Sequence, residues 1–411
     1  MTTLDTTFVR GQFPAFAEET LEQTVFLENA GGSHMCRQVM DRLDGFYRRC
    51  KVQPYYPNPV SMQAGHMMDE AYPALAAWMN VTPEEVYFGP STSQNTYVLA
   101  HAVLGWLQPG DEVIVTNQDH EANSGAWRRL AQCGMTVKEW TVDPVTGSLH
   151  LDKLLPLITD RTKLLAFTHC SNILGEVNPV ADICRAARER GVRTVVDGVS
   201  FAGHGLPDVR ALGADIYLFS LYKVYGPHLG AMVIAPDMAE NLHNQGHYFH
   251  EGVRVKRLMP SGPDHAQIGS AKGVADYFEA LYQHHYSDGD TASAAHKAEA
   301  VRALLKQGEH AAMAALLDYI DGNDRLQLIG PADPDRRNPT ISVLPAGKSP
   351  LELAEALGDK GILCGAGHFY SVRLVKALGI DPDLGVLRFS MVHYTSENDV
   401  KRLAAELDAL L

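Results

Sequence analysis

Two polar side chains, Asp197 and Lys223, follow neighbouring apolar runs in the segment 194–234. Asp197 ends the run TVVD, and Lys223 lies three residues after Ser220, which ends the run IYLFS. A lysine can hold an aldehyde as a Schiff base, and a carboxylate can pair with a protonated ring nitrogen. Taken singly, a loop lysine and a helix-capping aspartate are commoner than catalytic groups. Together, at this spacing, they predict a site for pyridoxal 5′-phosphate (PLP).

Each of these two residues has a requirement that its surroundings must meet. The Lys223 amine must be neutral to form the imine and to move a proton at the substrate carbon. Its pKa of ~10.4 therefore has to fall through burial or a nearby cation. A buried carboxylate at Asp197 would keep the ring nitrogen protonated, and only then does the ring act as an electron sink.

Composition and charge exclude several classes of protein. The 411 residues are 45% hydrophobic and 20% charged, which is ordinary for a globular enzyme that could hold two domains. A net charge of −14 argues against nucleic acid or an anionic membrane as a partner. The six cysteines form no CxxC pair, so no metal site or disulfide framework is expected. With no signal peptide or membrane-spanning run evident, we expect a cytoplasmic protein.

Strand and helix patterns alternate along the first two thirds of the chain, which predicts an α/β fold with a mostly parallel sheet. Only the ten residues 220–229 separate the last two strands, too few for a crossover helix, so this pair should be antiparallel. We therefore expect a mixed sheet of seven strands with one reversed. The predicted strands are 86–88, 112–116, 136–140, 163–167, 193–197, 215–219 and 230–234.

Further polar residues fall at or just after the ends of these strands. His120 and Asn172 do so, as do Asp197 and Ser220. Ligands of open α/β sheets bind beyond the carboxyl ends of parallel strands, so these four side chains should converge at one edge. An imidazole there can stack on the PLP ring and relay protons, and an amide can bond the ring's phenolic oxygen. A helix-capping or surface histidine is the alternative for His120.

Two loops offer backbone and hydroxyl groups to a ligand. Thr92 and Ser93 open a helix after Gly89-Pro90, and free N–H groups with the positive end of a helix dipole suit a phosphate. Serine and threonine are also common helix caps, so this signal alone is weak. Asn29 precedes two glycines, where the backbone can approach a ligand closely, although a plain turn is the alternative.

The chain is expected to divide into a segment and two domains. A helical stretch from Ala271 to His284 leads to the polar run YSDGDTAS, which marks the boundary. We predict a large PLP-binding domain at 21–285 and a smaller C-terminal α/β domain at 286–411. Residues 1–20 would form an N-terminal segment that packs with the small domain.

The assembled motifs resemble the class V aminotransferase group of fold-type I PLP enzymes, and within it the cysteine desulfurase-like and selenocysteine lyase-like proteins. LENAGGS is similar to the family's LDNAA, FGPSTSQN to its phosphate-binding turn, DHEAN to its EHHAN and SNILGEVNP to its SN-x-x-G segment. VVDGVSFAGH with SLYKVYGPHLG is the most specific pair, and RFSMVHYTSENDVKRL resembles a C-terminal R-x-S-x-x-x-YNT-x-EE segment. The resemblance covers nearly the whole chain. It implies a PLP enzyme acting on a small amino acid, and a homodimer with its site at the subunit interface.

The resemblance also implies a role for each matching residue. Lys223 would be the Schiff-base lysine, Asp197 the partner of the ring nitrogen and His120 the stacking residue. Arg388 would receive the substrate α-carboxylate as a bidentate pair, with Asn29 also beside the substrate. The remaining cofactor contacts would be Thr92, Ser93, Asn172, Ser200, His204 and Ser220.

Two departures from the desulfurase pattern affect the expected chemistry. Ser200 stands where desulfurases carry a glutamine, which weakens one contact without affecting the core chemistry. Tyr370, in GHFYSVR, stands where a GHHCAQP-like segment would carry the thiol that takes up sulfur as a persulfide. Cys364 lies six residues earlier, after an apolar run, and is expected to be a buried strand-end residue. Tyr370 would instead contact the substrate or donate a proton, and the alternative is an aromatic side chain that only forms a wall of the pocket.

Three functions are compatible with these residues. The leading hypothesis is a PLP-dependent lyase that cleaves a C–S bond by β-elimination and releases the fragment to solvent. The second is an aminotransferase or epimerase on the same scaffold, using the same lysine, aspartate and arginine. A binding or regulatory module is disfavoured because Lys223 and Asp197 are both intact.

Overall fold

A seven-stranded sheet forms the centre of the computed structural model, which describes residues 2–288 and 291–411. Its strand order is β2-β8-β7-β6-β5-β3-β4, and β8 runs antiparallel to both of its neighbours. The predicted mixed sheet with one reversed strand is therefore confirmed. The strands are β2 (Val86–Gly89), β3 (Glu112–Thr116), β4 (Thr136–Trp140), β5 (Thr162–Thr168), β6 (Arg193–Asp197), β7 (Ile216–Ser220) and β8 (Gly230–Ile234).

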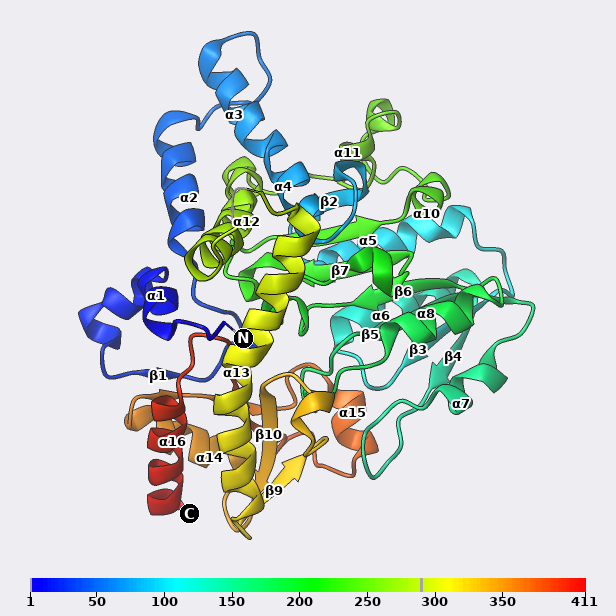
Figure 1. The fold of residues 1–411 in the computed structure, drawn as a ribbon. Helices are drawn as coiled ribbons and strands as arrows, with labels where there is room; N and C mark the ends of the chain where they lie inside the picture. The colour runs from blue at the N-terminus through cyan, green and yellow to red at the C-terminus, as the bar shows by residue number, and fades with distance from the viewer. Residues whose placement is uncertain (1, 289–290) are drawn as a thin grey trace.

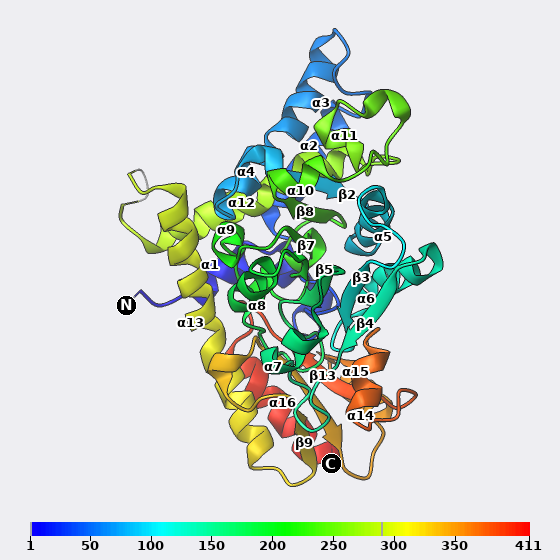
Figure 2. The same cartoon turned by 90° about the vertical axis from the view of Figure 1, so that its right-hand side faces the viewer.

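Both faces of this sheet are buried, because successive side chains of a strand point to opposite sides. In β5, Leu164 and Ala166 pack on one side with Trp127, whereas Leu165 and Phe167 pack on the other. Figures 1 and 2 show helices on both sides of the strands. The helices of this region are α2 (Arg37–Arg49), α3 (Pro59–Asp69), α4 (Ala71–Trp78), α5 (Thr92–Ala102), α6 (Glu121–Arg128), α7 (Leu151–Leu154), α8 (Val180–Arg188), α9 (Val209–Leu212), α10 (Pro236–Glu240), α11 (Arg254–Arg257) and α12 (His265–His285).

A second, smaller sheet forms the C-terminal part of the fold. Its four strands have the order β12-β13-β10-β9 and are all antiparallel. The long helix α13 runs from the neighbourhood of α12 and α4 down to this region in both views (Figures 1 and 2). The elements are α13 (Ala294–Asp321), β9 (Leu326–Ile329), β10 (Thr340–Pro345), α14 (Pro350–Asp359), β11 (Ile362–Leu363), β12 (Gly365–Gly367), α15 (Val372–Ala377), β13 (Val386–Ser390) and α16 (Glu397–Leu410).

The N-terminal residues contact the C-terminal region rather than standing alone. The side chain of Arg10, in α1 (Thr6–Gly11), donates to the Tyr394 carbonyl and forms an ion pair with Asp399. The strand β1 (Val25–Phe26) pairs in parallel with β11. The division into domains at 20/21 and 285/286 stays a prediction, and Gly289 and Asp290 of the boundary run, like Met1, lie outside the described residues.

Most predicted elements agree with the structure, and the main differences are at helix ends. The helix expected from Ala271 begins earlier, at His265, because the Asp264 side chain accepts the Ala266 N–H and caps it. In the described part of the chain, no helix combines the length and apolarity needed to cross a bilayer. A cytoplasmic location remains a prediction.

Candidate active site

A cavity of about 230 Å³ lies at the carboxyl ends of the parallel strands. The strand order brings β3, β5, β6 and β7 together, so the loops that follow them meet at this edge. Eight of the predicted site residues line the cavity: Thr92, Ser93, His120, Asn172, Asp197, Ser200, Ser220 and Lys223.

Lys223 lies in a single 3₁₀ turn that directly follows β7. The Leu221 N–H donates to the Leu229 carbonyl, which closes the short connection to β8 and fixes this turn. Burial, and next the positive charge of Arg388, lower the pKa of the Lys223 amine to about 8, while Asp197 opposes the shift. The neutral amine that imine chemistry requires is therefore far more populated near pH 7 than in an exposed lysine.

Asp197 ends β6 and is only 4% exposed. Burial raises the pKa of its carboxyl to about 6, although the Val199 N–H and Lys223 both favour the charged form. The Val199 N–H donates to Oδ1 at 2.8 Å, and Oδ2 accepts no hydrogen bond from any residue that the structure describes. At neutral pH the group is a carboxylate with one oxygen available to a cationic donor in the cavity.

His120 caps a helix, which is the alternative given for it, and it also lines the cavity, while its stacking on a cofactor ring stays a prediction. Its Nδ1 accepts the Ala122 N–H at 3.0 Å at the start of α6. Burial, with the charges of Lys223 and Arg388, lowers the pKa of the imidazole to about 4. The ring is therefore neutral at physiological pH and carries its proton on Nε2.

The N-terminus of α5 forms a polar end of the cavity. Ser91 caps this helix by accepting the Gln94 N–H, and Thr92 Oγ1 lies 2.8 Å from Ser220 Oγ of β7. Gly230 permits this close approach, since a Cβ there would lie 2.5 Å from the carbonyl carbon of Ser91. The first N–H groups of a helix have no partner within it, so this end can bind an anion.

Asn172 connects the cavity to the turn that precedes α15. Its Nδ2 donates to the Phe369 carbonyl at 2.9 Å, and its Oδ1 accepts the Ser371 hydroxyl at 2.7 Å. Phe369 and Tyr370 have φ values of 46° and 61°, a left-handed conformation that costs free energy in non-glycine residues. The Glu121 N–H donates to the Tyr370 carbonyl at 2.8 Å and helps to hold the strained turn against the start of α6.

Tyr370 lies at the rim of the site. Its ring is 5.2 Å from the His120 ring between centroids, but the residue is 68% exposed and does not line the cavity itself.

Cys364 follows β11 and is half-buried rather than fully buried. Burial and the nearby Glu28 carboxylate raise the pKa of its thiol to about 12, which keeps it protonated.

Arg388, on β13, is 2% exposed and already has protein partners. Its NH2 group donates to Glu28 Oε1 at 2.7 Å, and NH1 donates to the Asn172 carbonyl at 3.1 Å. The Phe369 ring covers the guanidinium, with 3.6 Å from its carbon to the ring centroid. Sequence reasoning missed Glu28 and Phe369, although they directly precede the two predicted residues Asn29 and Tyr370.

His204 is not brought into the cavity with the other predicted cofactor residues. It ends a 3₁₀ turn, and its Nδ1 lies 2.9 Å from Glu309 Oε2 of α13, which fixes the ring there. It borders a recess of only about 20 Å³ on another side of Lys223, together with Asn29. Asn29 is held by a hydrogen bond of 2.8 Å from its Nδ2 to the Ser390 carbonyl.

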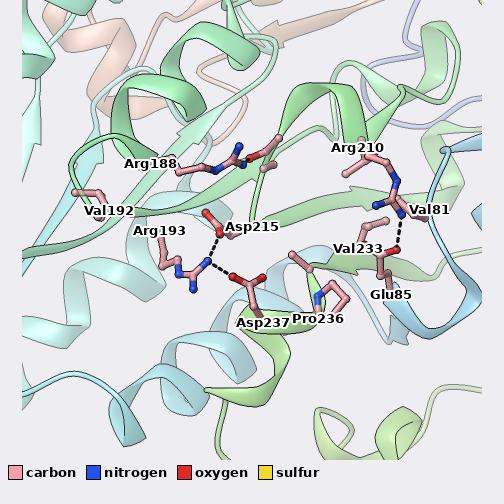
Figure 3. Close-up of a pocket in the computed structure, with 15 residues that line it drawn as sticks. Val81, Glu85, Arg188, Val192, Arg193, Arg210, Asp215, Val233, Pro236 and Asp237 are labelled. Atoms are coloured by element: carbon pink, nitrogen blue, oxygen red, sulfur yellow. Dashed lines mark hydrogen bonds and ion pairs between the residues drawn. The ribbon is translucent and has the colours of Figure 1, made fainter.

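A larger cavity, of about 530 Å³, lies at the opposite edge of the sheet (Figure 3). Arg193 pairs there with Asp215 and Asp237 at 2.7 and 2.6 Å, and Arg210 pairs with Glu85 at 3.0 Å. Although this cavity is larger, these charged side chains pair with one another. Neither Lys223 nor Asp197 lines it. We therefore assign the chemistry to the smaller cavity.

Comparison with known proteins places this geometry in context. The family model "Aminotransferase class-V" matches residues 25–258 and 289–403. An aminotransferase-like protein, FGM3, from Gibberella zeae is 33% identical over 98% of this chain and 98% of its own length. A probable cysteine desulfurase from Pseudomonas aeruginosa is 30% identical over 98% of this chain and 97% of its own. A cysteine desulfurase structure from Thermococcus onnurineus NA1 superposes with a TM-score of 0.85 at 21% identity, covering 100% of this chain and 99% of that one.

Proposed function

The chain belongs to the class-V aminotransferase family and is a PLP-dependent enzyme, and on that premise we propose that it is a cysteine desulfurase-like C–S lyase of the β-elimination type. Its substrate would be a small amino acid with a sulfur leaving group on the β-carbon. The observation that carries the proposal is the pairing of Tyr370 with His120 at the rim, where a persulfide-forming thiol would be needed for a desulfurase. The nearest thiol in sequence, Cys364, has a pKa raised to about 12.

The residues present fit PLP. Lys223 would hold its aldehyde carbon, the available oxygen of Asp197 its ring nitrogen, and the start of α5, with Thr92, Ser93 and Ser220, its phosphate. His120 would stack on the ring, and the second N–H of the Asn172 amide would reach the phenolic oxygen, with Ser200 nearby. When bound, PLP supplies an electron sink for the negative charge that develops at the substrate carbon.

The side chains of the chain itself would move the protons. The neutral form of the Lys223 amine, which the lowered pKa makes more populated than in an exposed lysine, would take the proton from the substrate α-carbon. The Tyr370 phenol donates a proton to the departing sulfur. Because Tyr370 is exposed, the leaving group would pass directly to solvent rather than to a protein thiol.

An aminotransferase or epimerase is the second candidate function. The similarity to an aminotransferase-like protein favours it. Both candidate functions use Lys223, Asp197 and Arg388 in the same way, so only the products separate them.

We expect Cys364→Ser to retain most activity, because a protonated, half-buried thiol contributes packing rather than chemistry. Tyr370→Phe should lower kcat by up to roughly 10²-fold through loss of the proton donor. The measurement is turnover with cysteine, combined with mass spectrometry of the protein.

The exposed Cys133 provides a matched control, since Cys133→Ser removes a thiol that does not line the site cavity. A protein adduct heavier by one sulfur atom on Cys364, lost together with activity in Cys364→Ser, would contradict the lyase proposal. It would instead make the protein a desulfurase with a relocated thiol.

Arg388→Lys should lower kcat/KM by roughly 10- to 100-fold, because an ammonium cannot reproduce the two-point contact with a substrate carboxylate. We propose that this carboxylate takes the place of Glu28 on the guanidinium when the substrate binds. Steady-state kinetics with a saturating range of substrate would measure the effect as a rise in KM.

Arg337→Lys is the matched control for that variant. Arg337 is a second buried arginine, and within the described residues its guanidinium bonds to backbone carbonyls alone, those of Pro331, Leu174 and Thr340. It should lower thermal stability with KM unchanged. An unchanged KM in Arg388→Lys would mean that the carboxylate binds elsewhere.

We also propose a homodimer with the site at the interface. Exposed apolar side chains lie on and near α3 and in the segment that leads to α11, at the upper part of the molecule in Figures 1 and 2. A groove of about 470 Å³ includes Tyr55, His247 and His250 and links the two regions. The exposed residues are Tyr47, Val52, Tyr55, Tyr56, Val60, Met62, Tyr248, Phe249 and Val253. Sedimentation at the mass of a single 45.0 kDa chain would refute the dimer.

A further inference from the structure

The anionic end of the proposed PLP site needs more positive charge than the residues already assigned provide. A phosphate monoester carries a charge of about −1.5 to −2 near pH 7. A helix N-terminus supplies only about +0.5, and the hydroxyl groups of Thr92, Ser93 and Ser220 are neutral. A cationic side chain at this end would therefore strengthen binding substantially.

Among the described residues that line the cavity, only three side chains can carry a positive charge: Lys223, His120 and His228. Lys223 would be committed to the aldehyde carbon. The pKa of His120 is lowered to about 4, and its Nδ1 is occupied by the Ala122 N–H. His228 is the remaining one.

His228 is held at the cavity by its stacking on Tyr222. The two rings are 5.0 Å apart between centroids and only 5° from parallel. Both rings line the cavity together with Ser91, Thr92 and Ser93 of the α5 start. The Ser33 N–H donates to the Tyr222 carbonyl at 3.0 Å, so the residue on which His228 stacks is itself fixed.

The ring nitrogens of His228 are available for a ligand. Neither of them hydrogen-bonds to a residue that the structure describes, and His228 is exposed to solvent although it lines the cavity. A neutral imidazole has one N–H donor, and a protonated one has two. The loop 221–229 ends beside the N-terminus of α5, because a Cβ on Gly230, two residues after His228, would lie 2.5 Å from the Ser91 carbonyl carbon and 2.7 Å from the Thr92 nitrogen.

We propose that His228 is a phosphate-binding residue that Tyr222 positions by stacking. Resting on the proposed PLP site, this inference adds a contact that the sequence motifs did not indicate. His228 would donate a charge-assisted hydrogen bond to a phosphate oxygen and complete the cradle formed by Thr92, Ser93 and Ser220.

The test compares two ligands that differ only in the phosphate. Pyridoxamine 5′-phosphate and pyridoxamine both lack the aldehyde, so neither forms a covalent bond with Lys223. Calorimetric titration of the full-length protein freed of cofactor would give both affinities without any assay of activity. His228→Gln should weaken binding of pyridoxamine 5′-phosphate by about 10- to 100-fold and leave pyridoxamine unchanged. His228→Arg should restore the preference for the phosphorylated ligand.

His101→Gln is the matched control, because His101 is exposed and lies at the other end of α5. It should change neither affinity. An equal loss for both ligands in His228→Gln would overturn the proposal by showing that the ring only supports Tyr222, and no loss for either would also overturn it. If neither ligand binds the unmutated protein, the PLP site itself fails, an outcome distinct from failure of the His228 contact.

Discussion

Lys223→Ala should abolish turnover while leaving a folded protein that still binds PLP without a covalent bond. The substitution removes both the attachment point of the cofactor and the base that acts at the substrate carbon. Loss of proton transfer alone lowers rates by roughly 10²–10⁴-fold. The visible absorbance band of lysine-bound PLP should disappear, and turnover should fall with it.

Lys306→Ala is the control for this variant, since Lys306 is an exposed lysine of α13 whose side chain is 66% accessible. It should keep both the absorbance band and the activity. Substantial turnover in Lys223→Ala would refute the assignment of this residue.

Asp197→Ala should lose both affinity for PLP and reaction rate. Without the carboxylate, the ring nitrogen is no longer held in its protonated form, and a neutral pyridine is a poor electron sink. Loss of one charge-assisted hydrogen bond weakens binding by about 10- to 100-fold. Asp197→Glu should keep part of each property. Equilibrium dialysis of PLP and steady-state kinetics would measure the two effects separately.

Asp215→Asn is a control at the opposite end of the same strands. Asp215 is also buried, 6% exposed, but it pairs with Arg193 in the cavity of Figure 3. The substitution should lower thermal stability and leave PLP affinity intact. If Asp197→Ala bound PLP normally, the ring nitrogen would not lie where we place it.

The sequence predicted the features that depend on local pattern. Strands such as 112–116 and 193–197 have the predicted bounds, because a buried parallel strand is a short apolar run between polar loops. The polar side chains at their ends meet at one edge, since parallel strands share a carboxyl edge. The sequence alone therefore predicted that Asp197 and Lys223 lie at the same edge of the sheet.

Other features depend on contacts between residues far apart in the chain, which no local pattern encodes. Glu28 and Arg388 form an ion pair across 360 residues, and Asn172 holds the turn around Phe369 across 197. The contact of His204 with Glu309 likewise required the position of α13. Stacking of His228 on Tyr222 spans only a short loop, but the sequence does not show which way the rings turn.

The products formed from cysteine and from a panel of related β-substituted amino acids test the lyase proposal most directly. Quantification of released leaving group, ammonia, 2-keto acid and pyridoxamine 5′-phosphate in one reaction mixture would give the stoichiometry. The lyase proposal predicts sulfide, ammonia and keto acid in equal amounts from cysteine, without accumulation of pyridoxamine 5′-phosphate. Keto acid formed with pyridoxamine 5′-phosphate and no leaving group would contradict it and identify an aminotransferase.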